Sequence, residues 1–172
     1  MSGGDREVVV RDLSPGEAGA YVRLRREMLA EAPWAFASSE QDDVGCDEAF
    51  LVARLGERGQ AIVGAFAGAE LVGAAGLFLA KHRKMAHRAR VWGVYVRPAY
   101  RGRGVARSVL ERVIEVARTW EGVSSVGLSV SERAEAAARL YARLGFVAWG
   151  CEPDALRVEG RGYAEIHMVR AL

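Results

Sequence analysis

Residues 94–107 read Val-Tyr-Val-Arg-Pro-Ala-Tyr-Arg-Gly-Arg-Gly-Val-Ala-Arg. The alternation of valine and tyrosine predicts a β-strand that stops at the proline, and a glycine-rich turn follows it. From Gly104 onward, apolar residues recur with the period of an amphipathic helix. The first N–H groups of a helix have no partner within it, and the helix dipole favours an anion there. Three arginines surround this turn: Arg101, Arg103 and Arg107. The stretch therefore predicts a cradle for a pyrophosphate.

The turn differs from two common nucleotide-binding loops. It lacks the GxxxxGK[ST] pattern of P-loop proteins. It also departs from GxGxxG, because Arg107 stands in place of the third glycine and hairpins flank the turn instead of βαβ crossovers. Two alternatives stay open: a nucleotide-binding protein that uses the same cradle, or a tight turn that Gly102 and Gly104 merely shape.

Outward from this stretch, short strand and helix patterns alternate along the chain. Strands are expected at residues 7–10, 61–66, 71–79, 88–96, 125–130, 146–151 and 166–170. Helices are expected from a capping sequence at 14–17 to Pro33, and at residues 47–55, 104–120 and 134–144. On the first helix, Arg25 is the odd member of a mostly apolar face. This order predicts a single α/β domain over residues 1–172, built around one mixed sheet.

Composition excludes several classes of protein. Hydrophobic residues make up 51% and charged residues 27% of the chain, as in globular domains. A net charge of +2 provides no basic field for nucleic acid, and no apolar run reaches the ~20 residues of a membrane span. Cys46 and Cys151 have no CxxC spacing, so no metal site is expected. Because the start is polar and no signal peptide is evident, the expected location is the cytoplasm, with both thiols free.

Two ordered motifs resemble the signatures of a known family. Arg101, Gly104 and Ala106 occupy the fixed positions of R/Q-x-x-G-x-G/A, which is the acetyl-CoA signature of the GNAT superfamily of N-acetyltransferases. The preceding residues 94–98 are similar to the fourth strand of that family, usually written V-x-P. Residues 137–146, Ala-Ala-Arg-Leu-Tyr-Ala-Arg-Leu-Gly-Phe, resemble its second signature, A-x-x-x-Y-x-x-x-G-F.

The resemblance covers nearly the whole chain and implies a fold and an activity. The expected fold is a single GNAT-type domain with a mixed, mostly antiparallel central sheet, flanked by helices, whose fourth and fifth strands splay apart. The expected activity is transfer of the acetyl group of acetyl-CoA to a primary amine of a small molecule, protein or peptide, by direct attack in a ternary complex. Many members form dimers, so a homodimer is also an expected assembly.

The resemblance also implies which residues hold acetyl-CoA. Backbone groups of the fourth strand are expected to pair with the pantetheine arm in the gap between the splayed strands (Val94, Tyr95 and Val96). The N–H groups of Gly102, Arg103, Gly104, Val105 and Ala106 are expected to hold the pyrophosphate. The side chains of the three arginines named above are expected to meet the phosphates. Ala137 leaves room for the arm. Many members have an asparagine where this chain has Ala134, and Ser131 is the candidate to replace its hydrogen bond.

Tyr141 is expected to protonate the departing CoA thiolate, as a tyrosine at this position does in many members. A phenol that points at developing negative charge stabilises a transition state. The alternative is a buried spacer whose hydroxyl bonds to the backbone. The general base is left open, because residues 88–96 contain no carboxylate; Glu165, His167 and Glu31 are candidates elsewhere in the chain.

The acceptor site of family members lies between the first helix–loop–helix and the last hairpin, here residues 31–39 and 152–163. Trp34 and Phe36 are expected either to form an apolar wall of that site or to anchor the loop in the core. A free amino acid, a small amine, an antibiotic and a protein N-terminus all stay open as acceptors. The alternative to an enzyme is a non-catalytic, regulatory module that binds acyl-CoA, because the fourth strand lacks a carboxylate.

Overall fold

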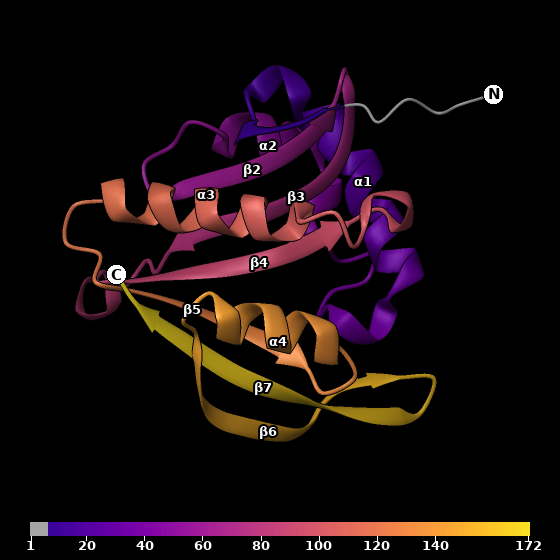
Figure 1. Cartoon of the computed structure of the whole chain (residues 1–172), viewed down its shortest axis with the longest axis vertical. Coiled ribbons are helices and arrows are strands. Elements are labelled where there is room, and N and C mark those ends of the chain that lie inside the picture. Colours follow the sequence, from indigo (N-terminus) through magenta and orange to yellow (C-terminus); the bar gives the residue numbers. More distant parts are fainter. Residues whose placement is uncertain (1–6) are drawn as a thin grey trace.

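The structure is a computed structural model that describes residues 7–172. A seven-stranded sheet forms its centre (Figure 1). Its strands are β1 (Val8–Asp12), β2 (Gln60–Ala67), β3 (Glu70–Leu79), β4 (Arg88–Val96), β5 (Ser125–Ser131), β6 (Val147–Val158) and β7 (Arg161–Ala171). They lie in the order β1-β2-β3-β4-β5-β7-β6. β4 pairs with β5 in parallel, whereas every other described pair is antiparallel. The mixed, mostly antiparallel sheet is therefore confirmed.

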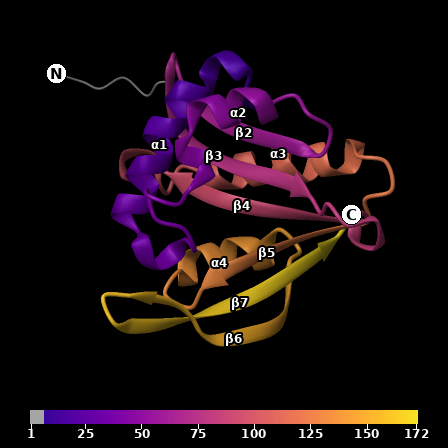
Figure 2. The ribbon, with the colours of Figure 1, turned by 180° about the vertical axis from the view of Figure 1, so that it is seen from behind.

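Helices cover both faces of this sheet (Figures 1 and 2). α1 (Ala18–Glu31) and α2 (Glu48–Arg54) pack on one face, and α3 (Val105–Thr119) and α4 (Glu135–Arg143) pack on the other. Because β2 and β3 are covered on both sides, they are buried at most positions. Within residues 7–172, no helix is both long enough and apolar enough to cross a membrane.

The sequence of α3 shows why this segment is helical. Apolar residues recur every third or fourth position, and Val105, Val109 and Val113 of this stripe are each at most 6% exposed. The opposite face is charged and forms ion pairs in solvent, such as Arg112 with Asp12 of β1 at 2.9 Å. Each buried valine contributes on the order of 1.5–3 kcal/mol, whereas an exposed ion pair contributes about 0–1 kcal/mol. The apolar stripe therefore holds α3 on the sheet.

The first α-helix begins one turn later than the sequence predicts. Pro15–Glu17 forms a 3-10 turn, and the α-helix starts at Ala18. The expected capping box is present at that turn, because the Glu17 carboxylate accepts the Ser14 backbone N–H at 2.9 Å. Short 3-10 turns are common at helix N-termini. The predicted start of the helical segment after Ser14 is therefore correct, and only the type of helix differs over Pro15–Glu17.

The last two strands extend beyond the expected residues 146–151 and 166–170. β6 continues to Val158 and β7 starts at Arg161, so the pair forms a two-stranded arm that passes the end of β5. Most residues of β6 are exposed, so the arm lacks the alternation of apolar residues that marks a strand. Backbone pairing between β6 and β7, rather than side-chain burial, defines this part of the hairpin.

β4 and β5 separate after a short paired segment. The ladder joins residues 88–90 of β4 to residues 125–127 of β5, and no later described residue of β4 has a partner on β5. On its other edge, the register of β4 against β3 shifts between Ala74 and Gly76. Gly93 lies in this bulge with a φ of 59°, a conformation that favours glycine. The expected splay is therefore confirmed, and it leaves the end of β4 with one open edge.

Candidate active site

Two cavities open on either side of the end of β4. The first, called here the splay cavity, has a volume of about 610 Å³ and lies between the end of β4 and α4. The second, the Trp92 cavity, has a volume of about 550 Å³ and lies around Trp92 between α2, the loop before α2 and strands β2 to β4. Ala35 and Phe36 line both cavities, and the consecutive residues Gly93 and Val94 line one each. The two cavities therefore meet at the bulge of β4.

The splay cavity brings together most of the side chains that the sequence predicts for cofactor binding and catalysis. These are Val94, Tyr95, Val96, Arg101, Ala106, Ala137 and Tyr141. Trp34 and Phe36, which were predicted to wall the acceptor site or anchor the loop, also line this cavity. Ser131 does not line it: the residue is 2% exposed, and its Oγ accepts the Arg133 N–H at 3.4 Å. A contact between Ser131 and the cofactor stays a prediction that this arrangement does not favour.

The turn before α3 presents backbone N–H groups to solvent. Gly102 and Gly104 have φ values of 72° and 79°, where a larger side chain is strained. The first hydrogen bond of α3 runs from the Ser108 N–H to the Gly104 carbonyl at 3.0 Å, so the preceding N–H groups lie outside the helical ladder. Residues 101–104 are all exposed. This geometry fits an anion at the N-terminus of α3.

Arg101, the first residue of the signature, points back toward α1. Its Nε donates to the Val96 carbonyl at 2.7 Å, and its Nη2 pairs with Glu31 at 2.7 Å. Glu31 also accepts a hydrogen bond from the Tyr95 hydroxyl. Hydrogen bonds from Tyr95 and Arg101 hold the pKa of Glu31 below its usual value, so this candidate base binds a proton weakly. Arg101 thus joins the turn to α1 across the mouth of the splay cavity.

Tyr141 is buried on α4 and lines the splay cavity. Its ring packs edge to face against Phe146, with the ring centres 6.0 Å apart. Burial raises the pKa of the phenol above its usual value, so Tyr141 stays protonated at neutral pH. Among residues 7–172, no group accepts a hydrogen bond from the Tyr141 hydroxyl. This differs from the alternative in which Tyr141 is a buried spacer whose hydroxyl hydrogen-bonds to the backbone.

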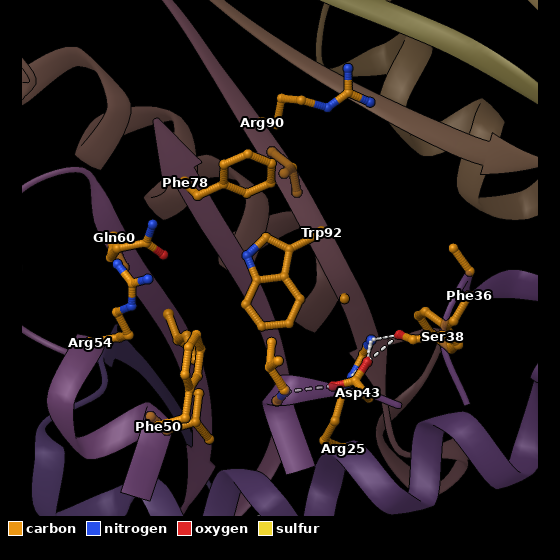
Figure 3. A pocket seen from close by; sticks show the side chains of 18 of the residues that line it. Arg25, Phe36, Ser38, Asp43, Phe50, Arg54, Gln60, Phe78, Arg90 and Trp92 are labelled. Carbon is orange, nitrogen blue, oxygen red and sulfur yellow. Dashed lines mark hydrogen bonds and ion pairs between the residues drawn. The ribbon is translucent and has the colours of Figure 1, made fainter. Parts of the chain in front are cut away.

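Aromatic side chains wall the Trp92 cavity (Figure 3). The Trp92 indole stands at its centre, with Phe78 beside it and Phe50 projecting from α2. Phe36 closes the side that is shared with the splay cavity. All of these rings are partly exposed and so present apolar surface to the cavity. A concave apolar surface of this size is typical of small-molecule sites.

A buried ion pair supports one wall of the Trp92 cavity (Figure 3). Arg25 of α1 and Asp43 of the loop meet at 2.5 Å, and each side chain is 5% exposed. Asp43 also accepts hydrogen bonds from the Ser38 hydroxyl and from the Gly45 N–H. The Arg25 guanidinium lies 5.4 Å from the Trp92 ring centre. The odd charged residue on the apolar face of α1 therefore ties that helix to the loop and to the aromatic wall.

Of the two candidate bases on β7, Glu165 lines the Trp92 cavity and His167 does not. Glu165 is half-buried, and burial raises the pKa of its carboxyl above the usual value. His167 has both ring nitrogens engaged, Nδ1 with the Ser129 Oγ at 2.8 Å and Nε2 with Glu152 at 3.2 Å. Glu165 is therefore the better positioned of the two to receive a proton from a ligand in this cavity.

Sequence reasoning missed most of the Trp92 cavity. Arg90 and Trp92 alternate along β4 with the buried residues Ala89 and Val91, a pattern that could have assigned the first two to a less buried face. Alternation does not reveal which distant segments border that face. Asp43 lies in an irregular segment, where no periodicity marks it as the partner of a helix residue.

Comparison with known sequences agrees with this arrangement. The sequence model of the acetyltransferase (GNAT) family matches residues 21–146, a range that contains both signatures. No curated protein is similar in sequence to this chain at a significant level.

Solved structures are similar over nearly the whole chain. The acetyltransferase of the GNAT family from Streptococcus pneumoniae is 22% identical with a TM-score of 0.85, over 96% of this chain and 100% of that one. A GCN5-related N-acetyltransferase from Kribbella flavida is 26% identical with a TM-score of 0.80, over 96% and 98%. The proposed acetyltransferase yncA from Salmonella typhimurium, with its cofactor acetyl-CoA, is 21% identical with a TM-score of 0.82, over 96% and 94%.

The structural likeness establishes the fold, and the sequence match establishes the family. The matched range covers most of the chain and includes the splayed strands, the turn before α3 and Tyr141. The chain therefore belongs to the GNAT family of acetyltransferases, enzymes that use acetyl-CoA as the acetyl donor.

Proposed function

We propose that this enzyme transfers the acetyl group of acetyl-CoA to a primary amine of a small molecule or peptide, by direct attack while both substrates are bound. The observation that carries this proposal is the meeting of the two cavities at Gly93 and Val94. One cavity is lined by six of the predicted acetyl-CoA residues (Val94, Tyr95, Val96, Arg101, Ala106 and Ala137), and the other offers a separate site across β4. Neither Cys46 nor Cys151 lines either cavity, which supports direct attack over a covalent acyl-enzyme.

In this proposal, the pantetheine arm lies along the open edge of β4. Val94 and Val96 have no partner on β5, so their backbone groups are the proposed contacts of the pantetheine amides. Ala137 lines the cavity from α4, and its small side chain leaves room for the arm. The pyrophosphate lies at the turn before α3, on the N–H groups of residues 102–106.

Arg103 and Arg107 are the proposed cationic partners of the phosphates, because both are exposed beside the turn before α3, whereas the Arg101 guanidinium points back to Glu31. Arg107 pairs with Glu111 at 2.8 Å, and the two side chains are 67% and 46% exposed. An exposed pair of this kind contributes about 0–1 kcal/mol, so a phosphate can replace the carboxylate at low cost.

The transfer needs proton movements that nearby side chains can perform. The ammonium group of the acceptor gives one proton to a base, and Glu165 is the proposed base. The amine nitrogen then forms a bond to the acetyl carbon, the carbon–sulfur bond breaks, and the sulfur takes a proton from Tyr141. The nitrogen of the new amide loses its second proton, and the phenol is restored. The products are one amide, one CoA thiol and one proton released to solvent.

We also propose that residues 1–172 form one domain that works in the cytoplasm. β1 and β7, from opposite ends of the described chain, belong to the same sheet, which supports a single domain. Cys46 and Cys151 are unpaired thiols, as is usual in a reducing compartment. A homodimer stays a prediction, which light scattering at micromolar concentration tests.

Thermal unfolding with four ligands tests the proposed cofactor site. Acetyl-CoA or CoA at ~100 times its dissociation constant should stabilise the protein by about 2.7 kcal/mol, and ATP or NAD should not. Stabilisation by ATP or NAD would support the nucleotide-binding alternative. Stabilisation by CoA without thiol release from acetyl-CoA, for any amine tried, would support the non-catalytic module.

Gly104→Val tests the anion cradle separately from the chemistry. A β-branched residue at a φ of 79° is strained, at a cost on the order of 1–3 kcal/mol. We expect the strained turn to shift and misplace its N–H groups, so that the dissociation constant of CoA, measured by calorimetry, rises about tenfold or more; a factor of ten corresponds to 1.4 kcal/mol. Gly122→Val is the matched control, because Gly122 has a φ of 80° in the turn after α3, away from the cradle. An equal loss of affinity in both variants would contradict a role for the cradle.

A further inference from the structure

The Trp92 cavity is more positive than an amine site requires. Among the described residues that line it, the cations are Arg25, Arg54, Lys81 and Arg90, and the carboxylates are Asp43 and Glu165. Arg25 and Asp43 neutralise each other at 2.5 Å. Arg54 also has a carboxylate partner, Glu57, so Lys81, Arg90 and Glu165 are left to face a ligand. A negative charge on the acceptor would be attracted by the two remaining cations, whereas a simple alkylammonium ion has only Glu165 to attract it.

Arg90 is the cation best positioned to bind that charge. Arg54 pairs with Glu57 at 3.0 Å at the outer end of α2, and Lys81 is exposed. Arg90 is half-buried, and its hydrogen-bond partner among the described residues is a neutral group, the Ser129 Oγ at 3.3 Å. A guanidinium without a carboxylate partner in a partly buried site is suited to bind a ligand carboxylate.

The sheet register relates Arg90 to Glu165. Arg90 pairs with Gly127 of β5, and its guanidinium reaches forward to Ser129. Glu165 pairs with Ser131, two residues further along β5. Two residues of a strand span about 7 Å. The ammonium and carboxylate groups of an amino acid, with one hydrogen bond at each end, bridge a distance of this order.

The lining of the cavities relates Glu165 to the reaction point. Glu165 and Gly93 both line the Trp92 cavity, and Val94, the residue after Gly93, lines the splay cavity. The two cavities meet at Gly93 and Val94. An amine beside Glu165 therefore faces the acetyl group, while a carboxylate on Arg90 lies deeper in the Trp92 cavity.

We propose that the acceptor is a free α-amino acid with a large apolar side chain. Its carboxylate pairs with Arg90, its amine faces Glu165, and its side chain packs on the aromatic wall (Phe50, Phe78 and Trp92) (Figure 3). The inference rests on the proposed function, in which the splay cavity binds acetyl-CoA and the Trp92 cavity binds the acceptor. Because a peptide N-terminus has no carboxylate next to its amine, peptides are poor acceptors in this proposal.

Matched acceptors test the carboxylate requirement. Thiol release from acetyl-CoA is measured with L-phenylalanine, L-leucine and L-methionine, with the corresponding amino acid amides, with 2-phenylethylamine and with a peptide that starts with phenylalanine. Loss of a hydrogen bond to a charged group lowers affinity about 10- to 100-fold. We therefore expect kcat/KM to be higher by this factor for the amino acids than for the amides, 2-phenylethylamine and the peptide. The amide has the less basic amine and the same size, so basicity cannot explain a slower reaction with it.

Arg90→Gln should remove that preference. We expect kcat/KM for L-phenylalanine to fall about 10- to 100-fold and the rate with 2-phenylethylamine to stay within about twofold. Arg88→Gln is the matched control, because Arg88 lies two residues earlier on β4, is also half-buried and lines neither cavity. Unchanged stabilisation of the Arg90→Gln protein by acetyl-CoA verifies that it is folded and binds the cofactor.

The outcomes separate this inference from the proposed function. Equal or faster turnover of the amides, 2-phenylethylamine or the peptide would overturn the inference and leave acetyl transfer to amines intact. Thiol release with none of the acceptors, together with no stabilisation by acetyl-CoA, would contradict the proposed function itself. Calorimetry with L-phenylalanine and the CoA-bound protein gives an independent measurement: no heat of binding would also overturn the inference.

Discussion

Tyr141→Phe should lower kcat by about 10²- to 10⁴-fold, the usual contribution of a general acid. The phenol is buried, lines the splay cavity and has its pKa raised by burial, so it holds a proton where the CoA thiolate would form. Phenylalanine keeps the ring and its contact with Phe146 but removes the proton. Because the ring is kept, KM for acetyl-CoA and stabilisation by CoA should change little.

Tyr163→Phe is the control for this experiment. Tyr163 is also buried, at 6% exposure, but it lies on β7 and lines neither cavity. Its substitution should leave kcat within about twofold, as expected for a residue away from the chemistry. A Tyr141→Phe enzyme with wild-type kcat would mean that the thiolate leaves without this acid and that Tyr141 is a spacer.

Arg25→Leu should destabilise the protein by about 3–5 kcal/mol. The variant leaves the Asp43 carboxylate buried without its cation, since both side chains are 5% exposed in the native pair. It also removes the guanidinium that lies 5.0 Å from the Phe36 ring centre and 5.4 Å from the Trp92 ring centre. We therefore expect KM for the acceptor to rise as well, because the aromatic wall loses a support. Denaturant unfolding measures the loss of stability.

A neighbouring surface pair supplies the control. Arg26 pairs with Glu40 at 3.0 Å, and these side chains are 52% and 54% exposed. Arg26→Leu should change stability by at most about 1 kcal/mol, as is usual for exposed ion pairs. An equal loss of unfolding free energy in Arg25→Leu and Arg26→Leu would mean that the buried pair of Arg25 and Asp43 does not hold the loop. The double variant Arg25→Leu, Asp43→Ala should be more stable than the sum of the single variants predicts, because no unpaired charge remains buried.

The effect of Arg25→Leu should also depend on pH. Burial opposes ionisation of Asp43, but the hydrogen bonds from Arg25 and Ser38 outweigh it and hold the pKa of Asp43 below its usual 3.8. A carboxyl group with a lowered folded-state pKa stabilises the protein above its unfolded pKa, and that stabilisation is lost as the pH falls through the folded value. The difference in the free energy of unfolding between the wild type and Arg25→Leu should therefore be largest at neutral pH and should decrease in acid.

Local patterns were sufficient for the elements that form the end of β4 and the turn before α3. The strand predicted over residues 88–96 is β4, and the helix predicted over 104–120 is α3 within a residue at each end. Both depend on signals carried by adjacent residues: alternation, a proline stop, glycine at positive φ and apolar residues every third or fourth position. The last hairpin was predicted too short because its outer residues are exposed on both faces and follow no apolar pattern.

The partners of charged residues could not be predicted in this way. The sequence identified Arg25 as an odd residue on an apolar face, but Asp43 is 18 residues away in an irregular loop. Arg101 was expected to contact phosphate, yet Glu31, 70 residues earlier, holds its guanidinium. Such pairs depend on where the loop and α1 lie relative to the sheet, and no local period encodes that position.

The sequence by itself determined the order of strands and helices and the two motifs, because these depend on short-range backbone preferences and fixed motif spacing. The resemblance of those motifs to the GNAT signatures implied the family fold, the splayed strands and the predicted role of Tyr141. Only the tertiary structure decided the proposed acceptor side. The Trp92 cavity draws its wall from α2, the loop before it, β2, β3, β4, β5 and β7. Arg90 and Glu165 line one cavity because strand order and register bring β4, β5 and β7 together. That juxtaposition joins residues distant in sequence through sheet pairing, and pairing is a property of the folded chain.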